Sequence, residues 1–279
     1  LDLSNFLEDE FARFIGVEPS YGEVNAYISA STVSSQSGKL SILANASPEI
    51  INLSVGGSGS GAVAAAGSVS VNYIRNSVTA KIKDNATVSA QSDVDLLATT
   101  SPLMVNLSGA GSGAGAAAVG IAFATNEMVS TVAAAIDGAA TTVGSLAGDV
   151  TVKAEIVNSD VIPTIALADT TLDFNAQIWS LAASGSGAGT ASGAASTSIN
   201  WIRNNIQATI GGGATVNVSD NKKVSVLAND TSTIHSLAGS GTGSGIAAIG
   251  ASIAYNYLGG DPDDASSTKR NILKATIGD

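Results

Sequence analysis

Cysteine is absent from this chain, and histidine occurs only once, at position 235. A disulfide framework is therefore excluded, and so is any metal site built from thiolates or from several imidazoles. A Ser-His-Asp set would require His235 to meet a nucleophile and an orienting acid, and nothing in the sequence marks either. We therefore interpret His235 as an ordinary strand residue, and we predict no catalytic residue and no enzymatic activity.

Cations and aromatic side chains are also scarce. Lys and Arg number 12 against 23 Asp and Glu, which gives a formal charge of −11. Nucleic-acid binding requires clustered cations, so nucleic acid is not an expected partner. Hydrophobic residues make up 44% of the chain but aromatic residues only 4%. The core must therefore be built from Ala, Val and Ile, with many glycines beside them.

What the sequence has in abundance is repetition. A Leu is followed by Gly at +4, +6 and +8 and by Asn at +19, four times without slippage. The frames begin and end at Leu53 and Asn72, Leu107 and Asn126, Leu181 and Asn200, and Leu237 and Asn256. A pentapeptide ending in Ile starts at Val24, Val78, Val132, Ile206 and Leu273, and its first two steps are 54 residues each. We therefore expect one elongated body whose repeats bury their apolar faces on their neighbours.

Between these marks the patterning predicts strands, so the expected fold class is all-β. Residues 78–100 alternate apolar and polar positions in short runs that are broken at Asp84-Asn85 and Ser92-Asp93. The Gly-Ala tracts also favour strands, because Gly costs about 1 kcal/mol in a helix interior. The three glycines of each frame share one parity and so face one side of a strand. We expect another backbone or sheet to approach that side closely.

The Asn at +19 has two interpretations that the sequence leaves open. Stacked from repeat to repeat, these amides would hydrogen-bond into a ladder. Alternatively, each Asn caps a turn before the next strand.

Three segments lie outside the repeating pattern. Residues 1–20 predict a short N-terminal helix, with Asn5 and Glu8 as its cap and box residue, that acts as a cap or linker to the array at 21–279. Insertions interrupt the array at about 155–178 and 258–270, and such excursions are the first candidates for recognition.

The second insertion holds the candidate metal site. Asp261, Asp263 and Asp264 cluster around Pro262. Carboxylate oxygens are ligands for Ca²⁺, so calcium is the candidate cofactor, with a solvated turn or an acid–base carboxylate pair as alternatives. No nucleotide cofactor is expected, because the Gly-rich tracts lack a following Lys-Ser or Lys-Thr.

Segments such as VGGSGSGAVAAAGSVSVNYIRNSVTAKI and GSGAGTASGAASTSINWIRNNIQATIGGGATVNVS resemble repeats of leukotoxin-like and filamentous haemagglutinin-like bacterial surface adhesins. The resemblance covers about residues 21–279. It implies a right-handed parallel β-solenoid that is secreted and located at the bacterial cell surface, and it supplies no catalytic residues. Because the chain starts at Leu1 without a signal-like region, we expect a segment of a longer polypeptide.

The expected function is that of a structural stalk within such an exoprotein. Its partners would be neighbouring repeats of the same polypeptide, together with a host receptor or glycan. A glycan-binding solenoid face is one alternative, but Thr79, Thr87, Thr99 and Thr100 do not keep register between repeats. A polysaccharide-cleaving β-helix enzyme is another. Uncharged runs at 50–74 and 96–126 are long enough to span a bilayer, but they are rich in Gly and Ser, so membrane insertion is not expected.

Overall fold

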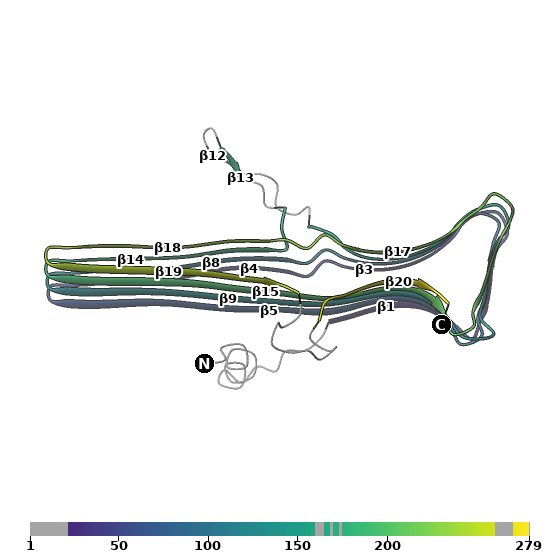
Figure 1. The fold of residues 1–279 in the computed structure, drawn as a ribbon, viewed down its shortest axis with the longest axis horizontal. Helices are drawn as coiled ribbons and strands as arrows, with labels where there is room; N and C mark the ends of the chain where they lie inside the picture. Colours follow the sequence, from purple (N-terminus) through teal and green to yellow (C-terminus); the bar gives the residue numbers. More distant parts are fainter. Residues whose placement is uncertain (1–21, 160–164, 168–169, 173–174, 260–269, 279) are drawn as a thin grey trace.

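The structure is a computed structural model that describes residues 22–159, 165–167, 170–172, 175–259 and 270–278. Throughout these ranges the chain forms strands and turns and no helix, and parallel strands stack into sheets as in a β-solenoid (Figure 1). The all-β prediction is confirmed. The helix predicted for residues 1–20 lies outside the described residues.

The chain runs through successive circuits, here called rungs. Rung 1 contains β1 (Gly22–Ser29), β2 (Thr32–Ser35), β3 (Leu40–Ala46) and β4 (Glu49–Ser60). Rung 2 contains β5 (Val63–Lys83), β6 (Thr87–Ala90), β7 (Val94–Thr100) and β8 (Leu103–Ala114). Rung 3 contains β9 (Ala117–Asp137), β10 (Thr142–Ser145), β11 (Val150–Ile156) and β14 (Ile178–Ala188). Rung 4 contains β15 (Ala191–Gly211), β16 (Thr215–Val218), β17 (Val224–Asp230) and β18 (Ile234–Ser244). Rung 5 contains β19 (Ala247–Leu258) and β20 (Ile272–Ile277).

Equivalent strands pair across the rungs into four parallel sheets. The long sheet has the order β1-β5-β9-β15-β19, and β20 also pairs with β15. The return sheet has the order β4-β8-β14-β18. Two smaller sheets complete each circuit: the end sheet of β2, β6, β10 and β16, and the third sheet of β3, β7, β11 and β17.

The recurring sequence positions pair with one another in these sheets. Leu53 aligns with Leu107, Leu181 and Leu237 in the return sheet. In the long sheet Asn72 aligns with Asn126, Asn200 and Asn256. The first residues of the pentapeptide form a third column there, made of Val24, Val78, Val132, Ile206 and Leu273. The unslipped frame of the sequence is therefore the strand register of the fold.

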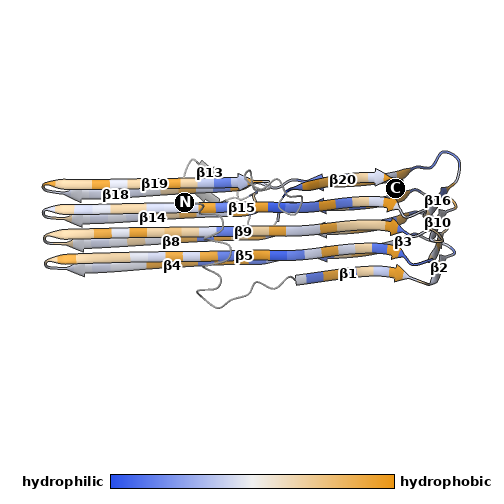
Figure 2. Cartoon of the chain, turned by 60° about the horizontal axis from the view of Figure 1, so that its bottom comes forward, coloured by the Kyte–Doolittle hydropathy of each residue, from blue (hydrophilic) through white to orange (hydrophobic). Residues whose placement is uncertain are grey.

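Each rung has two differently built halves. In one half, here called the base, the long, end and third sheets enclose an aliphatic core that includes Val78, Ile82, Leu96, Val152 and Ile206. In the other half, here called the arm, the first halves of the long-sheet strands lie directly against the return sheet. Ile74, Met104, Met128, Ile178 and Ile202 form a small cluster where arm and base meet. Strongly hydrophilic residues also occur in β5 and β15 at this boundary (Figure 2).

The long dimension of the body runs along its strands. The strands β5, β9 and β15 have 21 residues each, which corresponds to about 70 Å at about 3.3 Å per residue. Five rungs span only about 20 Å in the stacking direction. The five rungs therefore form a body that is longer along its strands than in the direction in which the rungs stack.

The insertion between β11 and β14 contributes its own strand pair. β12 (Ile165–Leu167) and β13 (Thr170–Leu172) pair with each other in antiparallel fashion and join none of the stacked sheets. The parallel array therefore continues past the insertion without a change of register at Asn200.

Candidate functional site

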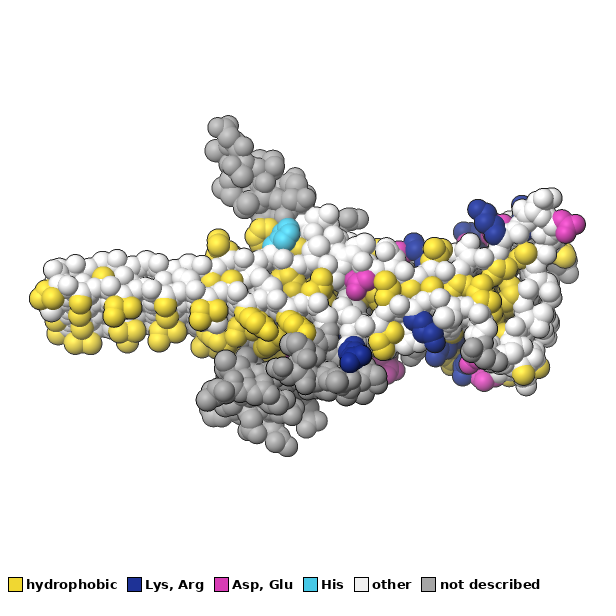
Figure 3. Space-filling view, in the orientation of Figure 1, with side chains coloured by type: hydrophobic (Ala, Val, Ile, Leu, Met, Phe, Trp, Pro, Cys, Tyr) yellow, Lys and Arg dark blue, Asp and Glu magenta, His cyan; other side chains and the backbone are white. Residues whose placement is uncertain are grey.

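The arm carries no Asp, Glu, Lys or Arg. The arm is taken here as residues 50–74, 103–126, 178–202 and 234–258, which begin just after Glu49, the first residue of β4. The ionisable side chains in these ranges are His235 and three Tyr residues. Charged side chains gather instead on the base (Figure 3). The molecule is therefore divided along its length into an uncharged half and a charged half.

The interior of the arm is polar. Asn72 donates to the Oδ1 atom of Asn126 at 2.9 Å, Asn126 to that of Asn200 at 2.7 Å, and Asn200 to that of Asn256 at 2.7 Å. Asn126 and Asn200 are fully buried. The ladder interpretation of the +19 Asn is therefore confirmed, and these residues lie within strands rather than in turns.

The return sheet supplies the other side of this interior. Asn52 donates to Asn72 at 2.9 Å, and Asn106 donates to Asn126 at 2.8 Å. Between β14 of rung 3 and β15 of rung 4 the two sheets are linked by hydroxyl groups, since the Oγ atoms of Ser180 and Ser198 lie 2.8 Å apart. Amides and hydroxyls therefore link the two sheets as well as the rungs, and small side chains let the sheets approach each other closely.

The predicted facing of the +4 and +6 glycines is wrong. A Cβ atom built on Gly111 or Gly113 has no atom within 4 Å, so these residues face open space. Ser112, between them, points to the interior, where its Oγ atom is buried. The physical reason is that the interior is polar and accepts Ser as readily as Gly, so the glycine row lies on the outer face.

Close backbone approach occurs at other glycines. A Cβ on Gly120 would lie 2.5 Å from the carbonyl oxygen of Gly185 in the facing sheet. The +8 glycine lies in the turn at the tip of the arm, where a Cβ on Gly189 would lie 2.2 Å from the carbonyl oxygen of Gly115. Among the glycines of the frame, the prediction of a close approach therefore holds for the +8 positions Gly115, Gly189 and Gly245, but not for Gly61.

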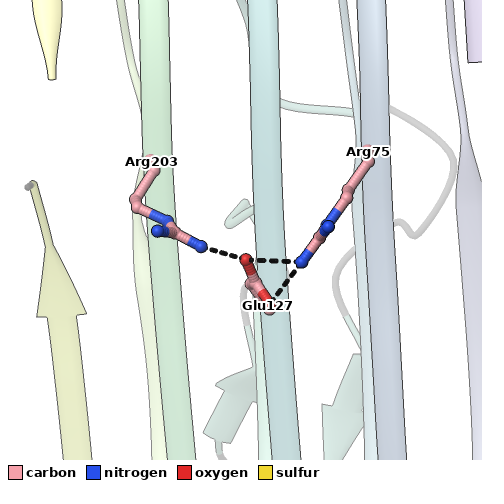
Figure 4. Close-up of polar contacts among 3 residues, drawn as sticks. All are labelled: Arg75, Glu127 and Arg203. Carbon is pink, nitrogen blue, oxygen red and sulfur yellow. Dashed lines mark hydrogen bonds and ion pairs between the residues drawn. The ribbon is translucent and has the colours of Figure 1, made fainter. Parts of the chain in front are cut away.

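Three charged residues meet where the arm ends. Arg75 of β5 donates to both carboxylate oxygens of Glu127 of β9, at 3.3 and 3.2 Å, and Arg203 of β15 binds the same carboxylate from the other side (Figure 4). The Glu127 side chain is 2% exposed, whereas those of Arg75 and Arg203 are 19% and 17% exposed. Three successive rungs are thus joined by one buried carboxylate, here called the Arg-Glu-Arg triad.

The triad is built for holding strands together rather than for proton transfer. Both oxygens of Glu127 are engaged by guanidinium groups, which cannot be deprotonated in a protein. Sequence reasoning missed this site. A signal existed, because Arg75 and Arg203 occupy one column of the long sheet and Glu127 lies two residues away on the same strand face.

The triad predicts a measurable loss of stability on neutralisation. Glu127→Gln keeps the shape of the side chain but leaves two guanidinium groups on neighbouring strands without a counter-charge. We expect a loss of about 2 kcal/mol in the free energy of unfolding, measured by urea denaturation. The matched control is Glu155→Gln, which removes the partly exposed pair with Lys153 and should cost less than about 1 kcal/mol. Equal losses in the two variants would contradict a special role for the triad.

Two further sets of residues named in the sequence analysis remain: His235 and the predicted calcium ligands, which stay a prediction. His235 is exposed, and its ring meets that of Trp179 edge-on with centroids 5.2 Å apart. Asp261, Asp263 and Asp264 lie outside the described residues. Within the ranges that are described, no group of three or more His, Cys, Asp or Glu side chains is placed to hold a metal ion.

One threonine column does keep register, contrary to the expectation from the sequence. Thr32, Thr87, Thr142 and Thr215 align at the start of the end-sheet strands. The four threonines considered in the sequence analysis, Thr79, Thr87, Thr99 and Thr100, lie within one rung and occupy different columns, so they do not reveal this column. The next outward column holds Ser34, Ser89, Gly144 and Asn217, so the regular array is one residue wide.

A surface pair fixes the turn after β5. The pKa of the Asp84 carboxyl lies below its ordinary value because Lys83 and then Ser29 donate to it, and the pKa of Lys83 is raised by the same carboxylate. Both side chains are exposed, so this pair adds little stability.

Across the described residues no helix is long and apolar enough to cross a membrane. No protein-family model, no curated protein and no solved structure matches the chain.

Proposed function

We propose that this chain is a structural repeat segment, a stalk, of a large secreted bacterial surface protein of the filamentous adhesin or exotoxin kind. In this proposal it is a right-handed parallel β-solenoid with repeats of about 54 residues, and its principal partners are neighbouring repeats of the same polypeptide. A host receptor or glycan would be bound by other parts of the parent protein or by the insertions.

The observation that carries the proposal is that chemically alike residues stack rung upon rung. Asn72 and Asn126, 54 residues apart, hydrogen-bond through their amides, and Asn126 bonds in the same way to Asn200 in the next rung. Each rung thereby satisfies the next one, as in proteins whose stability is a sum of repeats and their interfaces. The likeness of the repeat sequence to surface adhesins supports the secreted location.

Deletion of one rung tests the structural part of the proposal. Removing residues 67–120 joins Ala66 to Ile121, and Ile121 is the partner of Gly67 in the long sheet. We expect the shortened chain to fold with a single cooperative melting transition and a strand-dominated circular dichroism spectrum, because every column is preserved.

The matched control removes one residue fewer. Deleting residues 67–119 shifts the downstream part of the strand by one position and turns its side chains to the opposite face. This variant should lose cooperative melting. If both deletions melt alike, or if the in-register deletion does not fold, the rung is not the structural unit.

The location and the passive role are tested on the parent organism and on purified protein. Antibodies against this chain should label intact, unpermeabilised cells. Incubation with pectin-like and glycosaminoglycan substrates should release no products. Cleavage that disappears in the in-register deletion would assign the chain to the polysaccharide-degrading class instead.

A further inference from the structure

Within the described residues, the outer face of the long sheet in the arm is apolar and exposed. Several of the side chains that point away from the polar interior are Val or Ile, and Val69 and Ile121 remain 58% and 51% exposed. We call this surface the apolar arm face; its exposed aliphatic members include Val63, Val69, Val119, Ile121, Ile249 and Ile253. Figure 3 shows hydrophobic side chains gathered along the lower side of the arm.

The distribution of side chains is the reverse of that in an ordinary two-sheet sandwich. The interior of the arm buries Ser, Asn and Ala, including Ser68, Asn72 and Asn126, while the larger aliphatic side chains lie outside. Single exposed hydrophobic residues are normal on soluble proteins, but a contiguous patch of several hundred Å² marks an interaction surface.

The size of the face fits a second sheet. Four strands spaced about 4.8 Å apart and about nine residues long cover about 550 Å², so two such faces would bury about 1,100 Å². Specific interfaces begin at about 1,000 Å². Flat sheets with β-branched side chains pack face to face at a separation of about 10 Å.

We propose that the apolar arm face binds the same face of a second copy of this chain, around a two-fold axis. No Asp, Glu, Lys or Arg lies on the arm, and His235 belongs to the return sheet, so such pairing desolvates no charged group of the long sheet, although the chain carries a formal charge of −11. A two-fold arrangement presents the same patch from both copies, so the flatness of one face is matched by the other.

A lipid surface fits these observations less well. In the arm, β5 and β19 are the outermost strands of the long sheet, and hydrocarbon cannot satisfy the unpaired backbone groups of an open sheet edge. The negative formal charge also opposes approach to anionic headgroups. Lipid binding is therefore treated as the competing outcome of the test.

Single cysteines provide a sharp test, because the chain has none of its own. Gly67 lies on the apolar arm face, in the column of Ile121, and Gly111 lies on the outer face of the return sheet; a Cβ at either position has no atom within 4 Å. With a short bis-maleimide at micromolar protein, Gly67→Cys should form at least about five times more cross-linked dimer than Gly111→Cys. Equal cross-linking of the two variants would overturn the proposal.

Self-association gives an independent measurement. Val69→Lys combined with Ile121→Lys should weaken the dimer by about 100-fold or more in sedimentation equilibrium, because two charges from each copy would be buried at the interface. The control Leu237→Lys introduces a lysine on the return sheet, where the native side chain is 64% exposed, and should leave the dimer unchanged. Circular dichroism melting confirms that all variants are folded.

Two results would refute the dimer. One is a native chain that stays monomeric up to about 100 μM, since the cross-linking test requires dimer at micromolar protein. The other is a monomeric native chain that floats with neutral phosphatidylcholine vesicles and fails to do so as Val69→Lys with Ile121→Lys. That second result would make lipid the occupant of the face.

Discussion

Asn126→Leu should reduce the free energy of unfolding by about 4 kcal/mol or more. The Asn126 amide accepts hydrogen bonds from Asn72 and Asn106 and donates to Ser180 and Asn200. Leucine has a similar volume but makes none of these bonds, so four polar groups in a buried layer lose a partner at once. Each buried unsatisfied group costs about 1–3 kcal/mol, and the effects are not fully additive.

The same substitution at the end of the ladder is the matched control. Asn256 accepts one hydrogen bond from Asn200 and lies in an exposed strand. Asn256→Leu should therefore cost about 1 kcal/mol. Urea denaturation followed by circular dichroism measures both variants. If the central and terminal substitutions cost the same, the ladder does not contribute as an interconnected network.

Gly189→Ala should be among the most damaging single-methyl substitutions in the arm. The added Cβ would lie 2.2 Å from the carbonyl oxygen of Gly115, and that oxygen already accepts the backbone N–H of Gly189 at 3.1 Å. The turn between β14 and β15 must therefore move away from the turn between β8 and β9, which disturbs the hydrogen bonds between these two turns. We expect a loss of about 3 kcal/mol in the free energy of unfolding, at the upper end of overpacking effects.

Gly187→Ala is the control two residues away. Its Cβ would meet its nearest neighbour, the carbonyl oxygen of Gly243, at 4.0 Å. Alanine also restricts the unfolded chain, so this variant should be neutral or stabilised by up to about 1 kcal/mol. Thermal melting of the two proteins side by side distinguishes them. A Gly189→Ala protein as stable as Gly187→Ala would show that the tips are loosely packed.

Strand register could be predicted from the sequence because two independent marks repeat without slippage. The columns at Leu53 and Asn72 recur in every frame, and each column is a set of hydrogen-bonded neighbours in the structure. Parallel in-register stacking transmits a sequence frame directly into space, since equivalent residues must lie side by side. The Asn ladder follows from this register once the side chains are known to point inward.

The direction of the side chains could not be predicted in the arm. Hydrophobic contrast normally tells the inner from the outer face of a strand. In the stretch from Gly111 to Gly115 both faces of the strand carry small residues, so this contrast disappears. The sequence alone therefore places the glycine row on the wrong face. The return sheet, which faces the long sheet across this interior, is rich in Ser, and alternation of apolar and polar residues does not reveal which of its faces points inward.

The Arg-Glu-Arg triad was missed for a different reason. Its three residues come from three rungs and are offset by two positions, so no single repeat contains the motif. Only a register correct to the residue places Glu127 between Arg75 and Arg203. Where neighbouring repeats carry charged residues of opposite sign at the same or nearby columns, comparison across the aligned strands can therefore reveal an ion pair.

The polar interior of the arm also shapes how stability depends on temperature. Exposure of apolar surface raises the heat capacity on unfolding, whereas exposure of polar surface lowers it. In a single chain the arm hides Ser and Asn and leaves much of its Val and Ile already hydrated. The heat-capacity change per residue should therefore fall below the usual value of about 12–15 cal/mol/K. A small heat-capacity change gives a broad and shallow stability curve, in which cooling weakens the fold very little.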